Sequence, residues 1–171
     1  MAQNTELYMK ASLTRKVFLP FSLIGSNTQY NLEQRIKKIE GKCNKEGFVK
    51  PNSINILSYS AGELYSDKVV FHVLFECFIC RPVEGMVINC NAKNITKAGI
   101  RAEIKGHFSP VIIFISRDHH LKHKTFSKIK ENDDIIIRVI GKRYELNDEY
   151  ISIIGELYKK KKKKIVIKKK T

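Results

Sequence analysis

Apolar and polar residues alternate in the second half of the chain, in short runs that turn-forming residues separate. The run 86–94 has a period of two, and a second alternating run at 99–104 follows a turn-forming stretch that ends at Gly99. Three more strand-like runs follow, at 111–116, 134–146 and 149–158. A longer insert rich in His and Lys, 117–133, separates the third run from the fourth. Five short strands with this spacing predict a small closed β-barrel of the OB type.

The first half combines one helical pattern with several strand patterns. Apolar residues recur at helical spacing in 29–40, which predicts one amphipathic helix. In 67–82 apolar residues occupy most positions on both faces of a strand, as is typical of a central strand, and Pro82 ends it. We therefore predict an α+β fold in which one main helix lies on an antiparallel sheet and the barrel follows. The expected divisions are 1–82, 83–158 and a disordered lysine-rich tail, 159–171.

The chain is strongly basic, and the excess charge is concentrated at its end. It has 171 residues and a formal net charge of +15, of which nine lysines in 159–170 supply +9 and the rest of the chain +6. Such a charge balance indicates a polyanionic partner, for which we favour nucleic acid over an anionic membrane surface. The alternative is that the excess charge only keeps the protein soluble. The first residues do not resemble a signal peptide, and the apolar runs are too short to span a bilayer. We expect an intracellular protein with reduced cysteines and no membrane partner.

Two clusters resemble parts of metal sites. Cys77 and Cys80 have the spacing of half a zinc site, but residues three apart on a strand point to opposite faces. Although Cys43 and Cys90 are candidates to complete such a site, we interpret all four as buried free thiols. The cluster His119, His120 and His123 lies among lysines that repel a cation, and an exposed basic loop is the favoured interpretation. We predict no metal, no cofactor, no catalytic residue and no small-molecule substrate, since no catalytic motif is present.

The order of several segments resembles a known family. In sequence they are YMKASLTRKVFLP, EGKC after the helix, SINILSYSAGEL, VVFHVLFECFICRPVEGMV, NITKAGIRAEI and DDIIIRVIGKRYELNDEYISIIGEL. Together they resemble the seventh subunit of eukaryotic RNA polymerase II and its archaeal counterpart, versions of which large DNA viruses also encode. The resemblance spans nearly the whole chain up to Tyr158. No single segment is diagnostic, and the specificity lies in their order.

The resemblance implies a fold and a role for each half. The first half is expected to be a truncated RNP-like tip domain that docks on the polymerase core. The second is expected to be an OB barrel that binds emerging single-stranded RNA. The implied protein is a non-catalytic stalk subunit that pairs with a fourth-subunit homologue, in the nucleus, or in a virion or cytoplasmic viral factory if a virus encodes it. The positions that would contact the polymerase core are Gly41, Lys42, Cys43, Ser60, Ala61 and Gly62. Gly62 is expected in a tight turn with positive φ.

Basic residues on the barrel strands and their loops are the candidates for binding RNA. The positions predicted to bind RNA are Lys93, Lys97, Arg101, Phe114, Arg117, Lys122, Lys142 and Arg143. Members of the family often carry an aromatic residue after the glycine of the second strand, where this chain reads Gly99-Ile100-Arg101. The departure implies weaker stacking and a larger share of phosphate contacts, although the guanidinium of Arg101 can itself stack on a base.

Two other functions are open. A free-standing OB-fold RNA-binding protein, such as a translation factor, fits the barrel, but it has no need of the first half. A metal-dependent nucleic-acid enzyme built on the Cys and His residues is the other alternative, and metal analysis of the purified protein distinguishes it.

Overall fold

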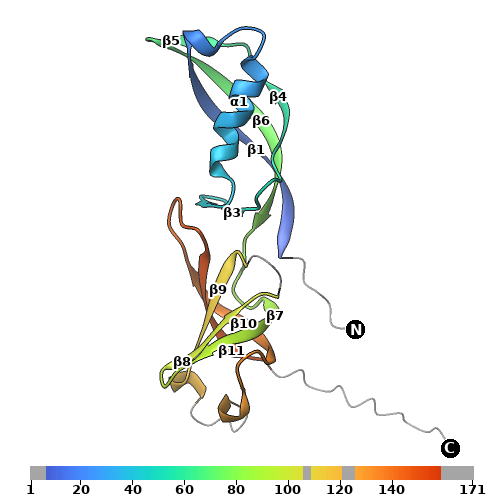
Figure 1. Cartoon of the computed structure of the whole chain (residues 1–171), viewed down its shortest axis with the longest axis vertical. Helices are drawn as coiled ribbons and strands as arrows, with labels where there is room; N and C mark the ends of the chain where they lie inside the picture. Colours follow the sequence, from blue (N-terminus) through green and yellow to red (C-terminus); the bar gives the residue numbers. More distant parts are fainter. Residues whose placement is uncertain (1–6, 106–108, 121–125, 159–171) are drawn as a thin grey trace, which may run out of the picture.

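The computed structural model describes residues 7–105, 109–120 and 126–158. The molecule is elongated, with a sheet and its helix at one end and a barrel at the other (Figure 1). The first half contains β1 (Tyr8–Pro20), η1 (Phe21–Leu23), α1 (Thr28–Ile36), η2 (Lys37–Ile39), β2 (Cys43–Asn44), β3 (Gly47–Val49), β4 (Asn55–Tyr59), β5 (Glu63–Tyr65) and β6 (Lys68–Cys80). The second half contains β7 (Val87–Ile95), β8 (Gly99–Glu103), β9 (Val111–Ser116), η3 (Asp118–His120), η4 (Phe126–Lys128), β10 (Asp134–Arg143) and β11 (Ile151–Leu157). The predicted α+β fold is confirmed.

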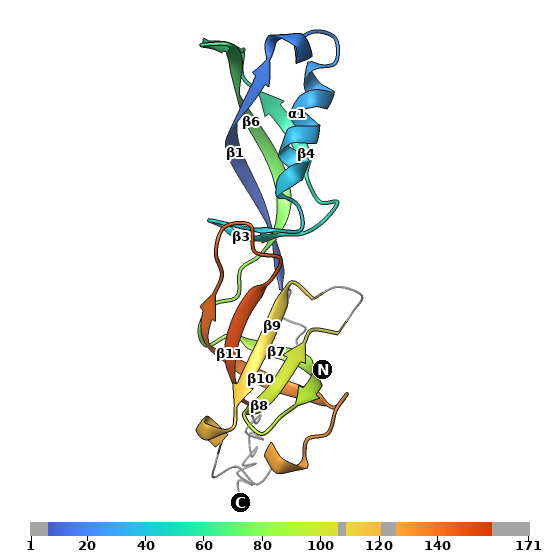
Figure 2. The same cartoon turned by 60° about the vertical axis from the view of Figure 1, so that its left-hand side comes forward.

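Strand β6 is the centre of the first sheet, as its apolar sequence predicts. It pairs antiparallel with β1 along its whole length, and with β3, β4 and β5 on its other edge. Helix α1 lies across one face of this sheet (Figure 2). On that face Phe75 and Ile79 of β6 are buried in one cluster with Leu32 and Ile36 of α1. The opposite face carries the exposed ring of Phe78 and, at the end of the strand, Cys80, which is buried in the barrel cluster.

The helix is shorter than its pattern predicts. The α-helical part ends at Ile36, and residues Lys37–Ile39 form a 3₁₀ turn. Leu32 and Ile36 are one helical turn apart and bury the same side, which accounts for the apolar spacing. No helix in the described part of the chain has the length and apolar character needed to cross a membrane.

Five strands close the barrel in the order β10-β11-β9-β8-β7, with β7 returning to β10. Strands β9 and β11 are parallel, and the other four pairs are antiparallel. Inward-facing isoleucines fill the barrel; they include Ile100, Ile113, Ile115, Ile137, Ile151 and Ile153. The prediction of a five-stranded OB-type barrel is confirmed.

The hydrophobic core of the barrel continues into the first half. Cys43, Phe48 and Cys80 are buried in the same cluster as the barrel isoleucines. The N–H of Gly85 also donates to the carbonyl of Val139 at 2.8 Å, which fixes the connection between β6 and β7 on the barrel. The expected boundary at residue 82 thus falls between two separate sheets, but apolar packing crosses it.

Candidate nucleic-acid interface

Three adjacent strands place Arg101, Phe114 and Ile154 side by side on the outside of the barrel. Phe114 of β9 is the register partner of Arg101 on β8 and of Ile154 on β11. Phe114 is 46% exposed and Ile154 is 49% exposed. Successive residues of a strand point to opposite faces, so the buried neighbours of these residues fill the core while this row faces outward.

A groove of about 560 Å³ follows this row. One wall is the turn between β7 and β8, with Thr96 and Ala98, and the floor includes Phe114 and Ile154. Gly99 lets this turn approach β9, because a Cβ at Gly99 would overlap the carbonyl oxygen of Ile115. The lining is mostly apolar, with Arg101 as its one charged member among the described residues. A flat ring, a guanidinium and an apolar floor suit a nucleobase.

The guanidinium of Arg101 is paired within its own strand. Its Nη2 lies 3.0 Å from Oε1 of Glu103, two residues further along β8. Both residues therefore belong to the outer face of the same strand. The positive charge at the groove is balanced by an adjacent carboxylate.

Position 100 lies between the barrel core and the groove, and the weaker stacking expected from its sequence stays a prediction. Ile100 is 2% exposed and lies in the barrel core. Ile100 is also among the residues that line the groove. The exposed side chains of this row are those of Arg101, Phe114 and Ile154, and Phe114 is its aromatic ring.

Arg117 supports the wall of the groove. Its Nη2 donates to the carbonyl of Thr96 at 3.1 Å, and its backbone N–H donates to the carbonyl of Ala98 at 2.9 Å. Its guanidinium also lies 5.3 Å from the centre of the Phe126 ring. These contacts hold the β7–β8 turn against β9, which makes Arg117 a positioning residue for the groove.

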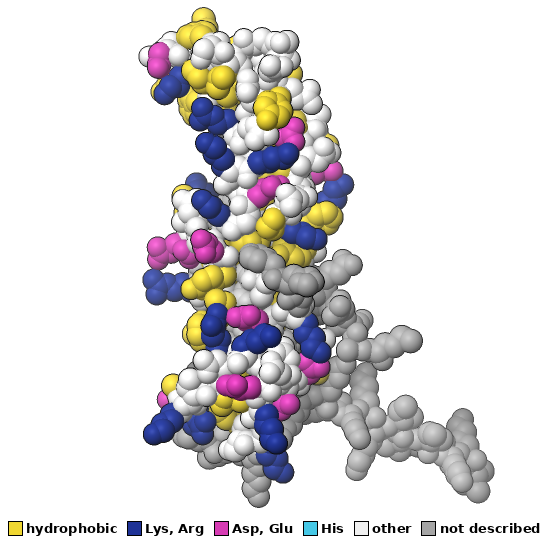
Figure 3. Space-filling view, in the orientation of Figure 1, with side chains coloured by type: hydrophobic (Ala, Val, Ile, Leu, Met, Phe, Trp, Pro, Cys, Tyr) yellow, Lys and Arg dark blue, Asp and Glu magenta, His cyan; other side chains and the backbone are white. Residues whose placement is uncertain are grey.

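The remaining predicted RNA-binding residues are dispersed. Lys97 is exposed in the β7–β8 turn, and Lys93 is exposed on β7. Lys142 donates from Nζ to the carbonyl of Pro82 at 2.7 Å, at the connection between the halves. Arg143 pairs with Glu145 at 3.2 Å, on a strand two places away from β8. Lys122 lies outside the described residues. On the face drawn in Figure 3, Lys and Arg side chains are spread over both halves, with Asp or Glu beside several of them.

His120 serves the barrel structure with both ring nitrogens. Its Nδ1 donates to the carbonyl of Ser116 at 2.7 Å, and its Nε2 accepts from the N–H of Leu157 at 3.0 Å. The ring is buried and stacks on Phe126 with centroids 5.3 Å apart. These bonds fix the neutral tautomer and leave no lone pair for a metal. The side chain of His119 and all of His123 lie outside the described residues.

The four cysteines are buried thiols. Burial raises the pKa of Cys77 to about 11 and that of Cys80 to about 12. The pKa of Cys43 is raised to about 11 and that of Cys90 to about 12, again chiefly by burial. Among the residues that the structure describes, no three His, Cys, Asp or Glu side chains gather as metal ligands would.

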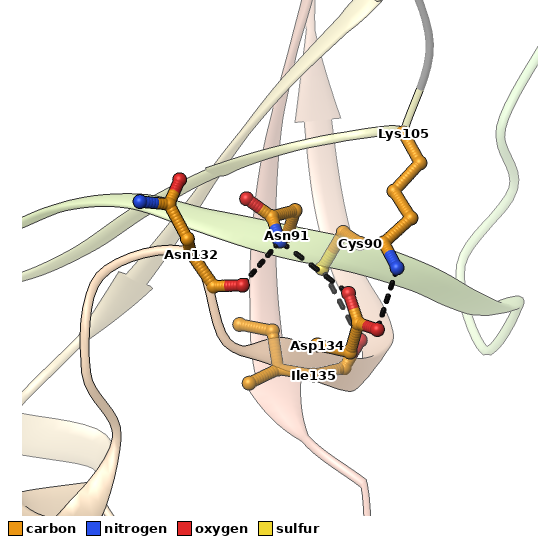
Figure 4. Close-up of polar contacts among 6 residues, drawn as sticks. All are labelled: Cys90, Asn91, Lys105, Asn132, Asp134 and Ile135. Carbon is orange, nitrogen blue, oxygen red and sulfur yellow. Dashed lines mark hydrogen bonds and ion pairs between the residues drawn. The ribbon is translucent and has the colours of Figure 1, made fainter.

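A polar cluster at the start of β10 ties three barrel strands together (Figure 4). Nδ2 of Asn91 donates to the carbonyl of Asn132 at 2.7 Å and to Oδ1 of Asp134 at 3.3 Å. Nζ of Lys105 lies 2.6 Å from the other carboxylate oxygen of Asp134. The hydrogen bonds from Lys105 and Asn91 lower the pKa of Asp134. This cluster joins β7, β10 and the end of β8. The charge of Lys105 is balanced by Asp134.

The predicted docking residues fall in two places. Lys42 and Cys43 line a pocket of about 270 Å³ beside the β10–β11 loop, near the middle of the molecule, and Gly41 directly precedes them. Ser60, Ala61 and Gly62 connect β4 to β5 farther along the sheet. Gly62 does not have the expected positive φ. Its missing side chain matters for packing, because a Cβ there would lie 2.5 Å from Cγ1 of Val69 and 3.0 Å from Cζ of Phe71.

Sequence reasoning missed an exposed apolar set at the end of the sheet farthest from the barrel. Phe18 and Tyr65 face outward with ring centroids 5.8 Å apart, edge to face. Leu64, next to Tyr65 in sequence, is 78% exposed, and Phe21, three residues after Phe18, is also exposed. The available signal was the adjacent pair Leu64-Tyr65 in a strand of three residues, since so short a strand leaves large side chains uncovered.

The fold defines a two-part α+β protein whose second part is an OB-type barrel, and relatives identify its family. No protein-family model matches the chain. A protein named putative DNA-directed RNA polymerase subunit in Acanthamoeba polyphaga mimivirus is 30% identical over 175 residues, which cover 92% of this chain and 84% of that protein. DNA-directed RNA polymerase II subunit rpb7 of Dictyostelium discoideum is 24% identical over 149 residues, which cover 72% of this chain and 84% of that protein. The chain belongs to this family of DNA-directed RNA polymerase subunits, which confirms the resemblance to the seventh subunit.

Proposed function

We propose that this chain is a non-catalytic stalk subunit of a multisubunit RNA polymerase, which binds emerging single-stranded RNA with its barrel and docks on the polymerase core with its first half. The observation that carries the proposal is the outward row of Arg101, Phe114 and Ile154 along an open groove. Rings on an OB-barrel face stack on bases without regard to sequence. The described residues that line the groove include no carboxylate, imidazole or thiol, which favours binding over catalysis.

Docking on the polymerase core is supported by two surfaces of the first half. The far apolar set, Phe18, Phe21, Leu64 and Tyr65, exposes side chains of the kind that protein interfaces bury. The pocket lined by Lys42 and Cys43 also contains Arg15 and Leu146, so it offers an apolar recess with a basic rim. Ser60, Ala61 and Gly62 act in this proposal by shaping the β4–β5 connection. We propose that the far apolar set makes the main contact with the polymerase core.

Pairing with a fourth-subunit homologue is supported by the uncovered face of the sheet. This face carries the exposed ring of Phe78, with Nζ of Lys50 5.6 Å from its centre, and Lys10 paired with Glu76 at 2.8 Å. An exposed aromatic ring is typical of the centre of a protein interface, and the charged residues around it suit the polar rim. The protein then acts where its polymerase acts, in the nucleus or in a virion or viral factory.

Affinity capture of the tagged chain from its native setting tests the polymerase role. We expect the large polymerase subunits and one further small subunit to co-purify. Leu64→Asp together with Tyr65→Ser should reduce recovery of the large subunits, whereas Ile140→Asp, a comparable change at an exposed apolar residue of β10, should not. Recovery of the wild-type chain with ribosomes or alone would contradict the proposal and favour a free-standing RNA-binding protein.

A further inference from the structure

Glu103 lies where it controls the charge of the groove. On β8 it is two residues beyond Arg101, and its Oε1 lies 3.0 Å from Nη2 of Arg101. Its register partner on β9 is Ile112, and the next partner across the barrel is Ser152 of β11. On β7 its register partner is Asn91, and among the described residues the cation within salt-bridge distance of its carboxylate is Arg101. About half of the Arg101 side chain stays exposed, so this pair is reachable from solvent.

A carboxylate and a phosphate compete for the same side of a guanidinium. Arginine binds either group through its planar fork of N–H donors. A phosphate that binds Nη2 of Arg101 must displace Glu103, and a phosphate that binds another N–H of the guanidinium remains beside the negative charge of Glu103. The pair thus lowers the affinity of the groove for the nucleic-acid backbone.

The same pair leaves the base-binding part of the groove intact. The contact with Glu103 is made by Nη2 of Arg101, and Phe114 remains the exposed register partner of Arg101 on the neighbouring strand. The guanidinium plane and the Phe114 ring both offer stacking surfaces, which bind bases and not phosphates.

We propose that Glu103 is a specificity-determining residue of the barrel face, which restrains phosphate binding by Arg101 so that the groove selects bases over bare polyanion. This inference rests on the proposed RNA binding by the groove. It assigns Glu103 a role opposite to that of the basic residues around it. Removal of the carboxylate should strengthen binding to RNA, and the gain should pass through Arg101.

A double-mutant cycle on the full-length chain tests the proposal. Glu103→Gln, Arg101→Gln and the double variant are titrated with a fluorescently labelled oligouridylate over a range of salt concentrations. An exposed ion pair is worth up to about 1 kcal/mol, so Glu103→Gln should tighten binding about two- to fivefold. One additional phosphate contact on a single strand steepens the salt dependence by about 0.7 in the logarithmic slope. In the Arg101→Gln background, Glu103→Gln should change neither the affinity for RNA nor the salt slope.

Glu63→Gln is the matched control, since it removes the same charge from an exposed residue of β5 in the other half of the molecule. It should leave affinity and salt slope at the wild-type values. Binding by the wild type with no gain in Glu103→Gln would overturn the role of Glu103 and leave RNA binding standing. An equal gain in the Arg101→Gln background, or in Glu63→Gln, would also overturn it, because the effect would then be general repulsion. No binding by the wild type and by Glu103→Gln would instead overturn the proposed function itself.

Discussion

The backbone N–H of Cys43 on β2 donates a hydrogen bond of 2.7 Å to the carbonyl of Asp148, in the loop between β10 and β11. A second bond of 2.8 Å runs back from the N–H of Asn147 to the carbonyl of Cys43. The barrel loop thus pairs with β2 in the manner of a short strand. Because Cys43 also packs in the barrel core, the two halves share both hydrogen bonds and apolar contacts. A motion of the far end of the sheet is therefore expected to carry the barrel with it.

Phe48→Ala should destabilise both halves together. Phe48 is fully buried in the cluster that joins the sheet to the barrel, and a Phe-to-Ala change in such a core costs about 3–5 kcal/mol. Amide hydrogen exchange in the presence of low denaturant should show faster exchange for β6 and for β9 alike. Phe78→Ala, at an exposed ring of the same sheet, should cost less than about 1 kcal/mol. Faster exchange confined to β6 would contradict the shared core.

Gly62→Val should weaken the first half and polymerase capture while the barrel keeps its RNA affinity. The new side chain would collide with Val69 and Phe71 of β6, which form the core beneath it. We expect a loss of about 1–3 kcal/mol, as overpacking of a core typically costs. Gly141→Val is the control, since a Cβ there meets no atom within 4 Å. Unchanged stability and capture in Gly62→Val would show that this connection is neither packed nor part of docking.

His120→Ala should destabilise the barrel by about 2–4 kcal/mol, because it leaves a carbonyl and an N–H without partners and opens a cavity beside Phe126. Thermal unfolding of the isolated full-length chain measures this loss, with His72→Ala on the sheet as the comparison. A chelator should not shift the wild-type melting temperature, since both nitrogens of His120 are already bonded. A chelator-dependent shift that His120→Ala abolishes would identify a metal site and contradict the structural role.

Stability should fall as the pH rises above the ordinary thiol range. Burial raises the pKa values of Cys80, Cys90 and the Tyr8 hydroxyl to about 12. A raised pKa means that the folded state holds protons that the unfolded state releases from about pH 9 upward for the thiols. The stabilisation is complete below that pH and is lost between about pH 9 and pH 12. Melting temperatures across this range should decrease, and less steeply in Cys90→Ala. A flat profile would contradict the burial of these groups.

Local patterns predicted the elements better than their contacts. Apolar residues on both faces identified β6 as central, and strand alternation identified the five barrel strands, because both patterns depend only on neighbouring residues. The helix pattern extended over the 3₁₀ turn at Lys37–Ile39, since an apolar residue at the next helical position looks the same in both. The pairing of Cys43 with Asp148 joins residues far apart in sequence, and no local signal indicates it.

Only part of the candidate site was predicted, because it too depends on contacts between residues far apart in sequence. Arg101 and Phe114 were identified separately, but their adjacency depends on the register of β8 with β9. The burial of Ile100 also follows from that register, and the weaker stacking expected at this position stays a prediction. The bond from Lys142 to Pro82 is equally a tertiary contact, so only the charge of Lys142 could be read in advance. The far apolar set was missed because exposure of Leu64 and Tyr65 depends on what covers a three-residue strand.

Titration of the full-length chain with a fluorescently labelled single-stranded RNA tests the central claim most directly. Phe114→Ala is compared with Phe18→Ala, because the two rings are exposed to similar extents, 46% and 43%, in opposite halves of the molecule. Stacking on one aromatic side chain contributes about 1–3 kcal/mol per base, so Phe114→Ala should weaken binding by about fivefold or more. Phe18→Ala should bind as the wild type does. Equal affinity of Phe114→Ala and the wild type would contradict RNA binding by the barrel groove.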